Sequence, residues 1–142
     1  MCDGAVRVLG CRLRVEVELD STGEWLWAEY ENMTVAAEAD NYTLQVTGYH
    51  GNAGDAFNDD NNANWRSNGM QFSTPDRDND EMSGICTNIW SSGWWFRACS
   101  SSCLNGVGKR HGTSYGVMFW YSTGSGNDDV RPVSTSRMML QC

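Results

Sequence analysis

The sequence predicts a loop-rich α+β fold, in which an antiparallel sheet in the first half is followed by an irregular second half. Two observations support this prediction. Apolar and charged residues alternate along Arg12–Leu19, the period-2 pattern of a half-buried strand. After Phe72, short apolar groups such as IW, GWWF and VMFW alternate with turn residues, and no segment keeps a helical period beyond two turns. Little helix is therefore expected.

Three extended runs make up the expected sheet-forming part, residues 11–57. The first is Arg12–Leu19, the second runs from Trp25 to Val35, and the third is Tyr42–Tyr49. Turn residues (DSTG) separate the first two runs. Strands that follow one another through short turns favour an antiparallel meander.

The next stretch, Gly51 to Gly69, is rich in Gly, Asn, Asp and Ala and has little periodicity. A stretch of this length without regular structure is usually functional or mobile. We therefore expect part of residues 58–64 to be flexible. The chain of 142 residues is long enough for a single domain, 1–142, with a buried core.

The charge balance excludes one class of partner. The formal net charge is −8, and the ten Lys and Arg residues are scattered along the chain. Phosphate binding depends on clustered basic residues, so nucleic acid is not an expected partner, whereas cations are. No apolar run approaches the ~18 residues of a membrane-spanning helix, and the first ten residues lack the apolar core of a signal peptide.

Six cysteines and two glycosylation sequons indicate an oxidising, extracellular setting, so we expect a secreted protein. The sequons begin at Asn32 and Asn41. Cys86 and Cys99 flank a short segment next to an acidic loop, and a disulfide between them would stabilise the fold by about 3 kcal/mol in the chain-entropy model. The other four cysteines allow three pairings, of which we favour Cys2 with Cys11 and Cys103 with Cys142.

That acidic loop reads DRDNDEMSG from Asp76 to Gly84. Carboxylates two residues apart in a loop can both point at a hard cation, while carbonyls complete its oxygen shell. Calcium is the natural occupant, although clustered Asp and Asn also suit an ordinary solvated turn. An EF-hand is excluded, because its sixth position needs Gly but is Glu81, and its twelfth needs Glu but is Thr87.

Three segments resemble the fibrinogen C-terminal domain family: NGMQFSTPDRDND from Asn68, SGWWFRAC from Ser92 and CLNG from Cys103. The likeness extends over nearly the whole chain, without the family's N-terminal subdomain. It implies that calcium is held by the side chains of Asp78 and Asp80 and the carbonyls of Met82 and Gly84. Asp76 would add negative potential nearby. Residues 58–142 then form a calcium- and ligand-binding part.

The resemblance also implies a ligand pocket beside the disulfide, with a cis peptide between Ala98 and Cys99. In lectin members of the family this pocket takes an acetyl group. Ser100 stands where those members have His, and Thr113 and Ser114 stand where they have Tyr, so the pocket here is altered. The implied ligand-contacting residues are Trp90, Arg97, Ala98, Cys99, Ser100, His111 at the rim, Thr113, Ser114 and Tyr115.

We therefore expect calcium-dependent recognition of acetylated glycans, of the bacterial cell-wall type, in innate immune pattern recognition. The alternative is a protein-binding module in clotting, adhesion or receptor signalling. Burying one methyl group yields only about 0.8 kcal/mol, so a single such pocket would bind weakly and an oligomer would supply avidity. The sequence holds no catalytic motif such as a Ser elbow or His-Glu-x-x-His, and no enzyme is expected.

Overall fold

The computed structural model describes residues 10–106, 117–121 and 132–142. Its main sheet has four strands, β1 (Cys11–Leu19), β2 (Trp25–Val35), β3 (Leu44–Gly51) and β6 (Val133–Gln141), in the order β3-β2-β1-β6. All neighbouring pairs are antiparallel. The predicted meander is therefore confirmed. Strand β6 was not expected, because its residues lie in the half of the chain for which irregular structure is predicted.

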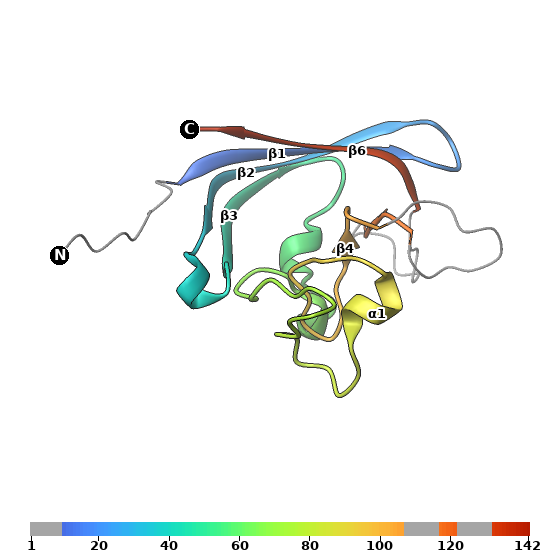
Figure 1. Cartoon of the computed structure of the whole chain (residues 1–142). Helices are drawn as coiled ribbons and strands as arrows, with labels where there is room; N and C mark the ends of the chain where they lie inside the picture. Colours follow the sequence, from blue (N-terminus) through green and yellow to red (C-terminus); the bar gives the residue numbers. More distant parts are fainter. Residues whose placement is uncertain (1–9, 107–116, 122–131) are drawn as a thin grey trace.

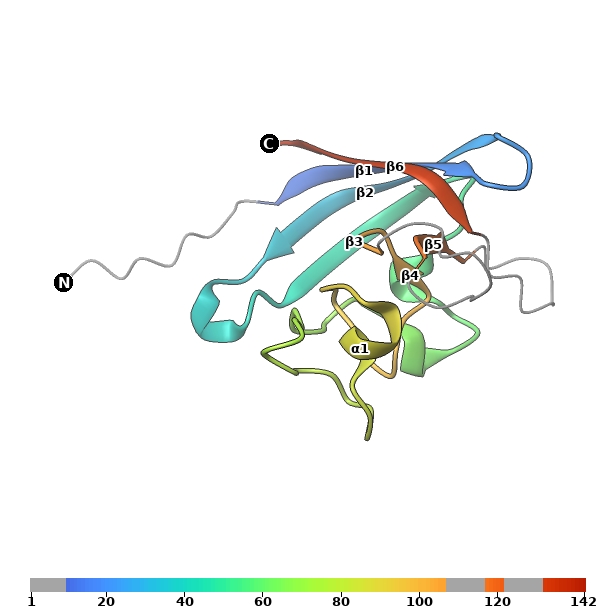
Figure 2. The ribbon, with the colours of Figure 1, turned by 45° about the vertical axis from the view of Figure 1, so that its right-hand side comes forward.

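The loop-rich part lies on one side of this sheet (Figures 1 and 2). Within the described ranges this part contains the single-turn 3₁₀ helices η2 (Ala56–Asn58) and η3 (Ala63–Trp65), one short helix α1 (Cys86–Trp90), and the strand pair β4 (Ser102–Cys103) and β5 (Phe119–Trp120). A further single-turn 3₁₀ helix, η1 (Glu38–Asp40), connects β2 to β3. No helix in the described ranges is long and apolar enough to cross a membrane. The predicted α+β fold with little helix is thus observed.

Strand β1 shows why the sheet forms where it does. Its residues alternate between buried and accessible, and the buried positions are the apolar ones, including Leu13, Val15 and Val17. These side chains face the loop-rich part, while the charged residues between them face solvent. A shift of one residue would move the whole apolar set to the solvent face, so the sequence pattern fixes the register.

An aromatic cluster joins the sheet to the loops. The ring of Phe57, which is fully buried, lies 5.3 Å from Tyr30 of β2, 5.3 Å from Trp120 of β5 and 6.1 Å from Trp94. The Tyr30 hydroxyl donates to Asp55 Oδ1 at 2.7 Å, and burial raises the pKa of this hydroxyl. Rings at these separations stabilise beyond the area they bury. The two parts of the molecule therefore share one core.

The disulfide pattern corrects one prediction. Cys86 pairs with Cys99 as expected, but Cys11 pairs with Cys142 across a sequence separation of 131. The reason is the pairing of β1 with β6, which sets Arg12 opposite Gln141 and brings the Cα atoms of Cys11 and Cys142 to 4.4 Å. The favoured pairs Cys2–Cys11 and Cys103–Cys142 are wrong. Cys2 lies outside the described residues.

Cys103 is a free, fully buried thiol in β4. Its sulfur lies 2.9 Å from the hydroxyl of Ser92, and burial raises the pKa of the thiol. A raised pKa keeps the thiol neutral and unreactive, so Cys103 serves as a small apolar core residue.

Candidate calcium and ligand site

The acidic loop begins with a tight turn that is anchored to the core. Thr74 and Arg77 exchange two backbone hydrogen bonds, and the Asn79 amide Nδ2 donates to Phe72 O at 2.7 Å. The Asn79 N–H donates to Ser73 Oγ at 3.0 Å, and Ser73 is fully buried. These bonds fix the residues on both sides of Asp78 while leaving Asp78 exposed.

Asp80 organises the rest of the loop. Its Oδ1 accepts from the Met82 N–H at 2.8 Å, and its Oδ2 accepts from the Cys86 N–H at 2.9 Å. Asp78 Oδ1 accepts from the Asp80 N–H at 3.2 Å, which holds the two acidic residues side by side. Burial raises the pKa of Asp80, and the negative charge of Asp78 raises it further, against the lowering by the two N–H groups.

The donor groups of this loop are of the kind that a hard cation binds. Two carboxylates that repel one another gain from a divalent ion between them, and the carbonyls of Met82 and Gly84 are oxygen donors of the kind calcium takes. Among the described residues no group of three His, Cys, Asp or Glu side chains could hold a metal. A cation here would therefore need backbone carbonyls and water to complete its shell.

The disulfide and the Ala98–Cys99 peptide lie beside this loop. The peptide is cis, as the family resemblance implied. Arg97 spans the two segments: its Nη1 lies 3.0 Å from Glu81 Oε1, and the Glu81 N–H donates to the Arg97 carbonyl at 2.8 Å. The Met82 sulfur packs 3.5 Å from Cys99 Sγ. The acidic loop and the disulfide thus form one connected unit.

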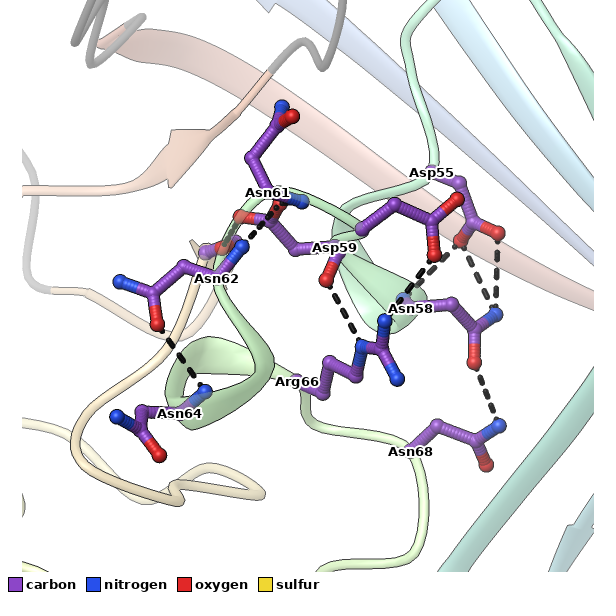
Figure 3. A network of polar contacts seen from close by, with 10 residues as sticks. Asp55, Asn58, Asp59, Asn61, Asn62, Asn64, Arg66 and Asn68 are labelled. Atoms are coloured by element: carbon purple, nitrogen blue, oxygen red, sulfur yellow. Dashed lines mark hydrogen bonds and ion pairs between the residues drawn. The ribbon is translucent and has the colours of Figure 1, made fainter.

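Residues 55–68 support this unit through a network of Asp, Asn and Arg side chains (Figure 3). Asp59, only 3% exposed, accepts from the N–H groups of Asn61 and Asn62 and from the Ser101 hydroxyl. The Ala98 N–H donates to Asn64 O at 3.0 Å. This stretch, part of which was expected to be flexible, contains several side-chain hydrogen bonds to nearby backbone groups. Its Asp and Asn content, typical of residues that bond nearby backbone, was the available signal.

Two predicted pocket residues make contacts within the protein. Ser100 is 5% exposed, and its hydroxyl lies 2.8 Å from the Ser67 hydroxyl, so it is held by the protein. Trp90 ends α1 and packs against Phe119 with ring centres 4.4 Å apart. Arg97, Ala98 and Cys99 are all partly accessible. His111, Thr113, Ser114 and Tyr115 lie outside the described residues.

The adjacent tryptophans divide between two roles. Trp94 is buried in the core. Trp95 packs edge-on against Phe72 at 5.1 Å, and its Nε1 donates to Tyr42 O at 2.9 Å. It therefore links the acidic-loop region to the segment before β3.

Comparison with known proteins decides the family. Residues 7–141 match the family model described as fibrinogen beta and gamma chains, C-terminal globular domain. This chain belongs to that family. The fibrinogen-like domain is 43% identical over 102 residues to the human fibrinogen alpha chain, 41% over 124 residues to human fibroleukin and 41% over 96 residues to human angiopoietin-related protein 6.

These matches cover 69%, 84% and 68% of the domain but only 12%, 27% and 19% of the respective relatives. The chain thus spans under a third of the length of these relatives. Among solved structures, the fibrinogen-like globe domain of human ANGPTL2 has a TM-score of 0.76 at 34% identity, covering 93% of this chain and 58% of that one. The relatives named here are fibrinogen, fibroleukin and angiopoietin-related proteins, so the expected lectin subfamily receives no support from them.

A lamprey fibrin D-dimer, solved with the peptide ligand Gly-His-Arg-Pro-amide, has a TM-score of 0.77 at 28% identity. The similarity covers 94% of this domain and 45% of that chain. The ligand bound to that relative is thus a peptide.

Proposed function

We propose that this fibrinogen-like domain is a secreted, non-enzymatic module that recognises a protein or peptide segment, with calcium supporting the binding surface. The observation that carries the proposal is its similarity to the lamprey fibrin structure with a bound peptide. Glycan recognition, favoured by the resemblance alone, has no comparable support among the relatives.

The charge of the domain favours a basic segment as the ligand. The formal net charge is −8, so the domain stays negative, at about −6, when one calcium ion neutralises Asp78 and Asp80, and Asp76 in the same loop keeps its charge. Complementary charge steers association and sets specificity more than it sets affinity. The peptide amine and guanidinium of a basic segment would meet this negative surface.

Residues 97–99, beside the disulfide, supply a surface for such a segment. Residues 97–99 are held between Glu81, Asn64 and the Cys86–Cys99 bond. We assign the N–H groups of Cys99 and Ser100 as donors to a ligand carbonyl, with Trp90 forming an apolar wall. A surface that is already ordered loses little entropy on binding.

Calcium, in this proposal, is held by Asp78, Asp80 and the carbonyls of Met82 and Gly84. The ion would neutralise the two carboxylates and fix the loop against the disulfide. Extracellular sites of this kind bind calcium with a Kd of about 10⁻⁴ to 10⁻³ M, which is sufficient in calcium-rich fluids. The two disulfides agree with an oxidising, extracellular location.

Titration of the domain with Gly-His-Arg-Pro-amide, in calcium and in chelator, tests the binding function. We expect binding in calcium that weakens in chelator, followed by tryptophan fluorescence or calorimetry. The matched control is the same peptide with an acetylated amine, which removes one positive charge. A parallel titration uses N-acetylglucosamine. Binding of the sugar without binding of either peptide would replace the peptide proposal by the glycan one.

The calcium site is tested separately by Asp78→Asn. Asparagine keeps an oxygen that accepts the Asp80 N–H but removes the charge that binds the ion. At about 10 mM calcium and a Kd of about 1 mM, the wild-type domain gains about 1.4 kcal/mol, or roughly 4 to 6 °C in Tm. The variant should lose this gain.

Two controls keep that test specific. Asp76→Asn removes a neighbouring charge outside the assigned donor set and should keep most of the calcium-dependent gain. Without calcium, Asp78→Asn should be at least as stable as the wild type, because the repulsion of Asp80 is relieved. A wild-type melting temperature that is the same in calcium and in chelator would remove calcium from the proposal.

A further inference from the structure

We propose that Asn41 carries an N-linked glycan whose first sugar lies in a groove between residues 38–42 and residues 72–77. The groove has a volume of about 440 Å³ and is lined by Glu38, Asn41, Tyr42, Phe72, Asp76 and Arg77, among others. It is separate from the pocket assigned to residues 97–99. The proposal rests on the secretion part of the proposed function and is independent of its ligand.

The backbone at Asn41 is held in place while its side chain borders the groove. Asn41 follows η1 and has φ of 49°, and Tyr42 has φ of 55°, so two successive non-glycine residues are left-handed. The Asn41 N–H donates to Glu38 O and its carbonyl accepts from the Phe72 N–H, each at 2.9 Å. The backbone polar groups of Asn41 are therefore used internally, and Asn41 is one of the residues that line the groove.

Two aromatic residues give the groove the surface that a sugar ring needs. Tyr42 is 44% exposed, so its ring is accessible to a sugar. Its carbonyl is fixed by Trp95 Nε1 at 2.9 Å, and Phe72 packs edge-on against Trp95 at 5.1 Å. The apolar face of a sugar ring can cover these rings without ordering them further.

Polar groups at the rim suit the hydroxyl and acetamide groups of the same sugar. Asp76 and Glu38 accept hydrogen bonds, and Arg77 donates them. An apolar wall with a few convergent polar groups is the usual composition of a small-molecule site.

The second sequon differs in its surroundings. Asn32 lies within β2, which pairs with β1 on one side and β3 on the other, and Asn32 is opposite Thr47 in the ladder with β3. It does not belong to the groove lining. Asn32 therefore serves as the control: a glycan there would have no aromatic wall of this kind to lie against.

The attachment chemistry needs a lipid pyrophosphate carrying an oligosaccharide, the donor used in the secretory pathway. Asn41 Nδ2 attacks the anomeric carbon of the first sugar. The carbon–nitrogen bond forms, the carbon–oxygen bond to the pyrophosphate breaks, and the proton lost by the amide leaves with the lipid pyrophosphate. The hydroxyl of Thr43, two residues on, completes the sequon.

Expression of the chain behind a secretion signal in an animal cell line tests occupancy. Peptide-N-glycosidase in heavy-oxygen water converts a glycosylated Asn to labelled Asp, which mass spectrometry locates. We expect label at position 41 in the wild type and in Thr43→Ser, and none in Thr43→Val. Secreted chain without label at position 41 overturns the proposal, whether or not Asn32 is labelled. Failure of the chain to be secreted would overturn both this proposal and the secretion part of the proposed function.

The place of the sugar is tested after trimming the glycan to its first residue. The trimmed domain should melt a few degrees above Asn41→Gln, the size expected for one aromatic contact in a domain of this length. In Tyr42→Ala that difference should vanish, whereas in Asn32→Gln it should persist. An equal gain with and without Tyr42 would show that the sugar projects into solvent, which contradicts the groove assignment.

Discussion

The sheet and the loop-rich part are held together by different means. In the sheet, strand β1 buries every second side chain, and these buried side chains are the apolar residues of the alternating sequence pattern. In the loop-rich part, the side chains of Asp59 and Asp80 accept from backbone N–H groups two to six residues away, and Arg97 donates to the distant Arg66 carbonyl. Both parts share one apolar core, but the loop-rich part depends in addition on these specific polar contacts. The two parts should respond differently to substitution.

Removal of the Cys11–Cys142 disulfide should have the largest effect. Its sequence separation is 131, for which the chain-entropy model gives about 5 kcal/mol, against about 3 kcal/mol for Cys86–Cys99 with a separation of 13. We expect the double substitution Cys11→Ser and Cys142→Ser to weaken hydrogen-exchange protection in β1 and β6. The double substitution Cys86→Ser and Cys99→Ser should weaken this protection mainly in residues 76–99. A reversed order of the two losses in denaturant unfolding would contradict this assignment.

Phe57→Ala should destabilise both parts at once by about 3 to 5 kcal/mol, because the ring contacts Tyr30 of the sheet and Trp94 and Trp120 of the loop-rich part. Urea unfolding followed by tryptophan fluorescence and by far-ultraviolet dichroism measures it. Coincident transitions by the two probes indicate one shared core. Separate transitions would show two independent units. Phe57→Leu, which keeps most of the volume, should cost less than about 1.5 kcal/mol.

Asp59→Ala should cost about 2 to 3 kcal/mol and loosen the loop-rich part selectively. The change leaves the Ser101 hydroxyl and two N–H groups without the acceptor they use. Asp60→Ala is the matched control, since the Asp60 side chain is 93% exposed and should change stability by less than about 0.5 kcal/mol. Hydrogen exchange at residues 97–102 should rise only in the first variant; an equal rise in both would remove Asp59 from its supporting role.

Glu81→Gln should have the smallest effect, below about 1 kcal/mol, because its ion pair with Arg97 is largely exposed. Arg97→Ala should cost more, since Arg97 also donates to the carbonyls of Arg66 and Asn68. Thermal unfolding of the two variants at low and high salt separates the contributions. The loss of stability caused by Glu81→Gln should be smaller at high salt, whereas the loss caused by Arg97→Ala should be nearly the same at both salt concentrations.

The same contrast explains what the sequence could predict. The alternation of apolar and charged residues and the turn residues between the two runs predict the bounds of β1 and β2, and the predicted bounds lie within one residue of the observed ones. Strand β6 was missed because its residues, VSTSRMMLQ, do not alternate cleanly, and most of them are exposed. The partner of Cys11 was missed for the same reason, since only the β1–β6 pairing brings Cys142 to it.

In the site, the acidic loop and the Cys86–Cys99 pair were predictable because they are local in sequence. The role of Asp59 could not be predicted, because its partner Ser101 is 42 residues away. Hydrogen bonds between distant segments produce no periodic pattern in the sequence. Ser100 was expected to contact a ligand, and its hydroxyl is held by Ser67, 33 residues earlier. Local composition gives the kind of chemistry, and long-range packing decides which atoms remain available.

The Cys11–Cys142 bond also has a mechanical consequence. It joins the first residue of β1 to the residue that follows β6, with their Cα atoms 4.4 Å apart. Tension that enters at Cys11 and leaves at Cys142 passes through this covalent bond, and the residues between them carry none of the load. Under a pulling force of this kind the domain behaves as a short inextensible link, and its core unfolds only after the disulfide has been reduced.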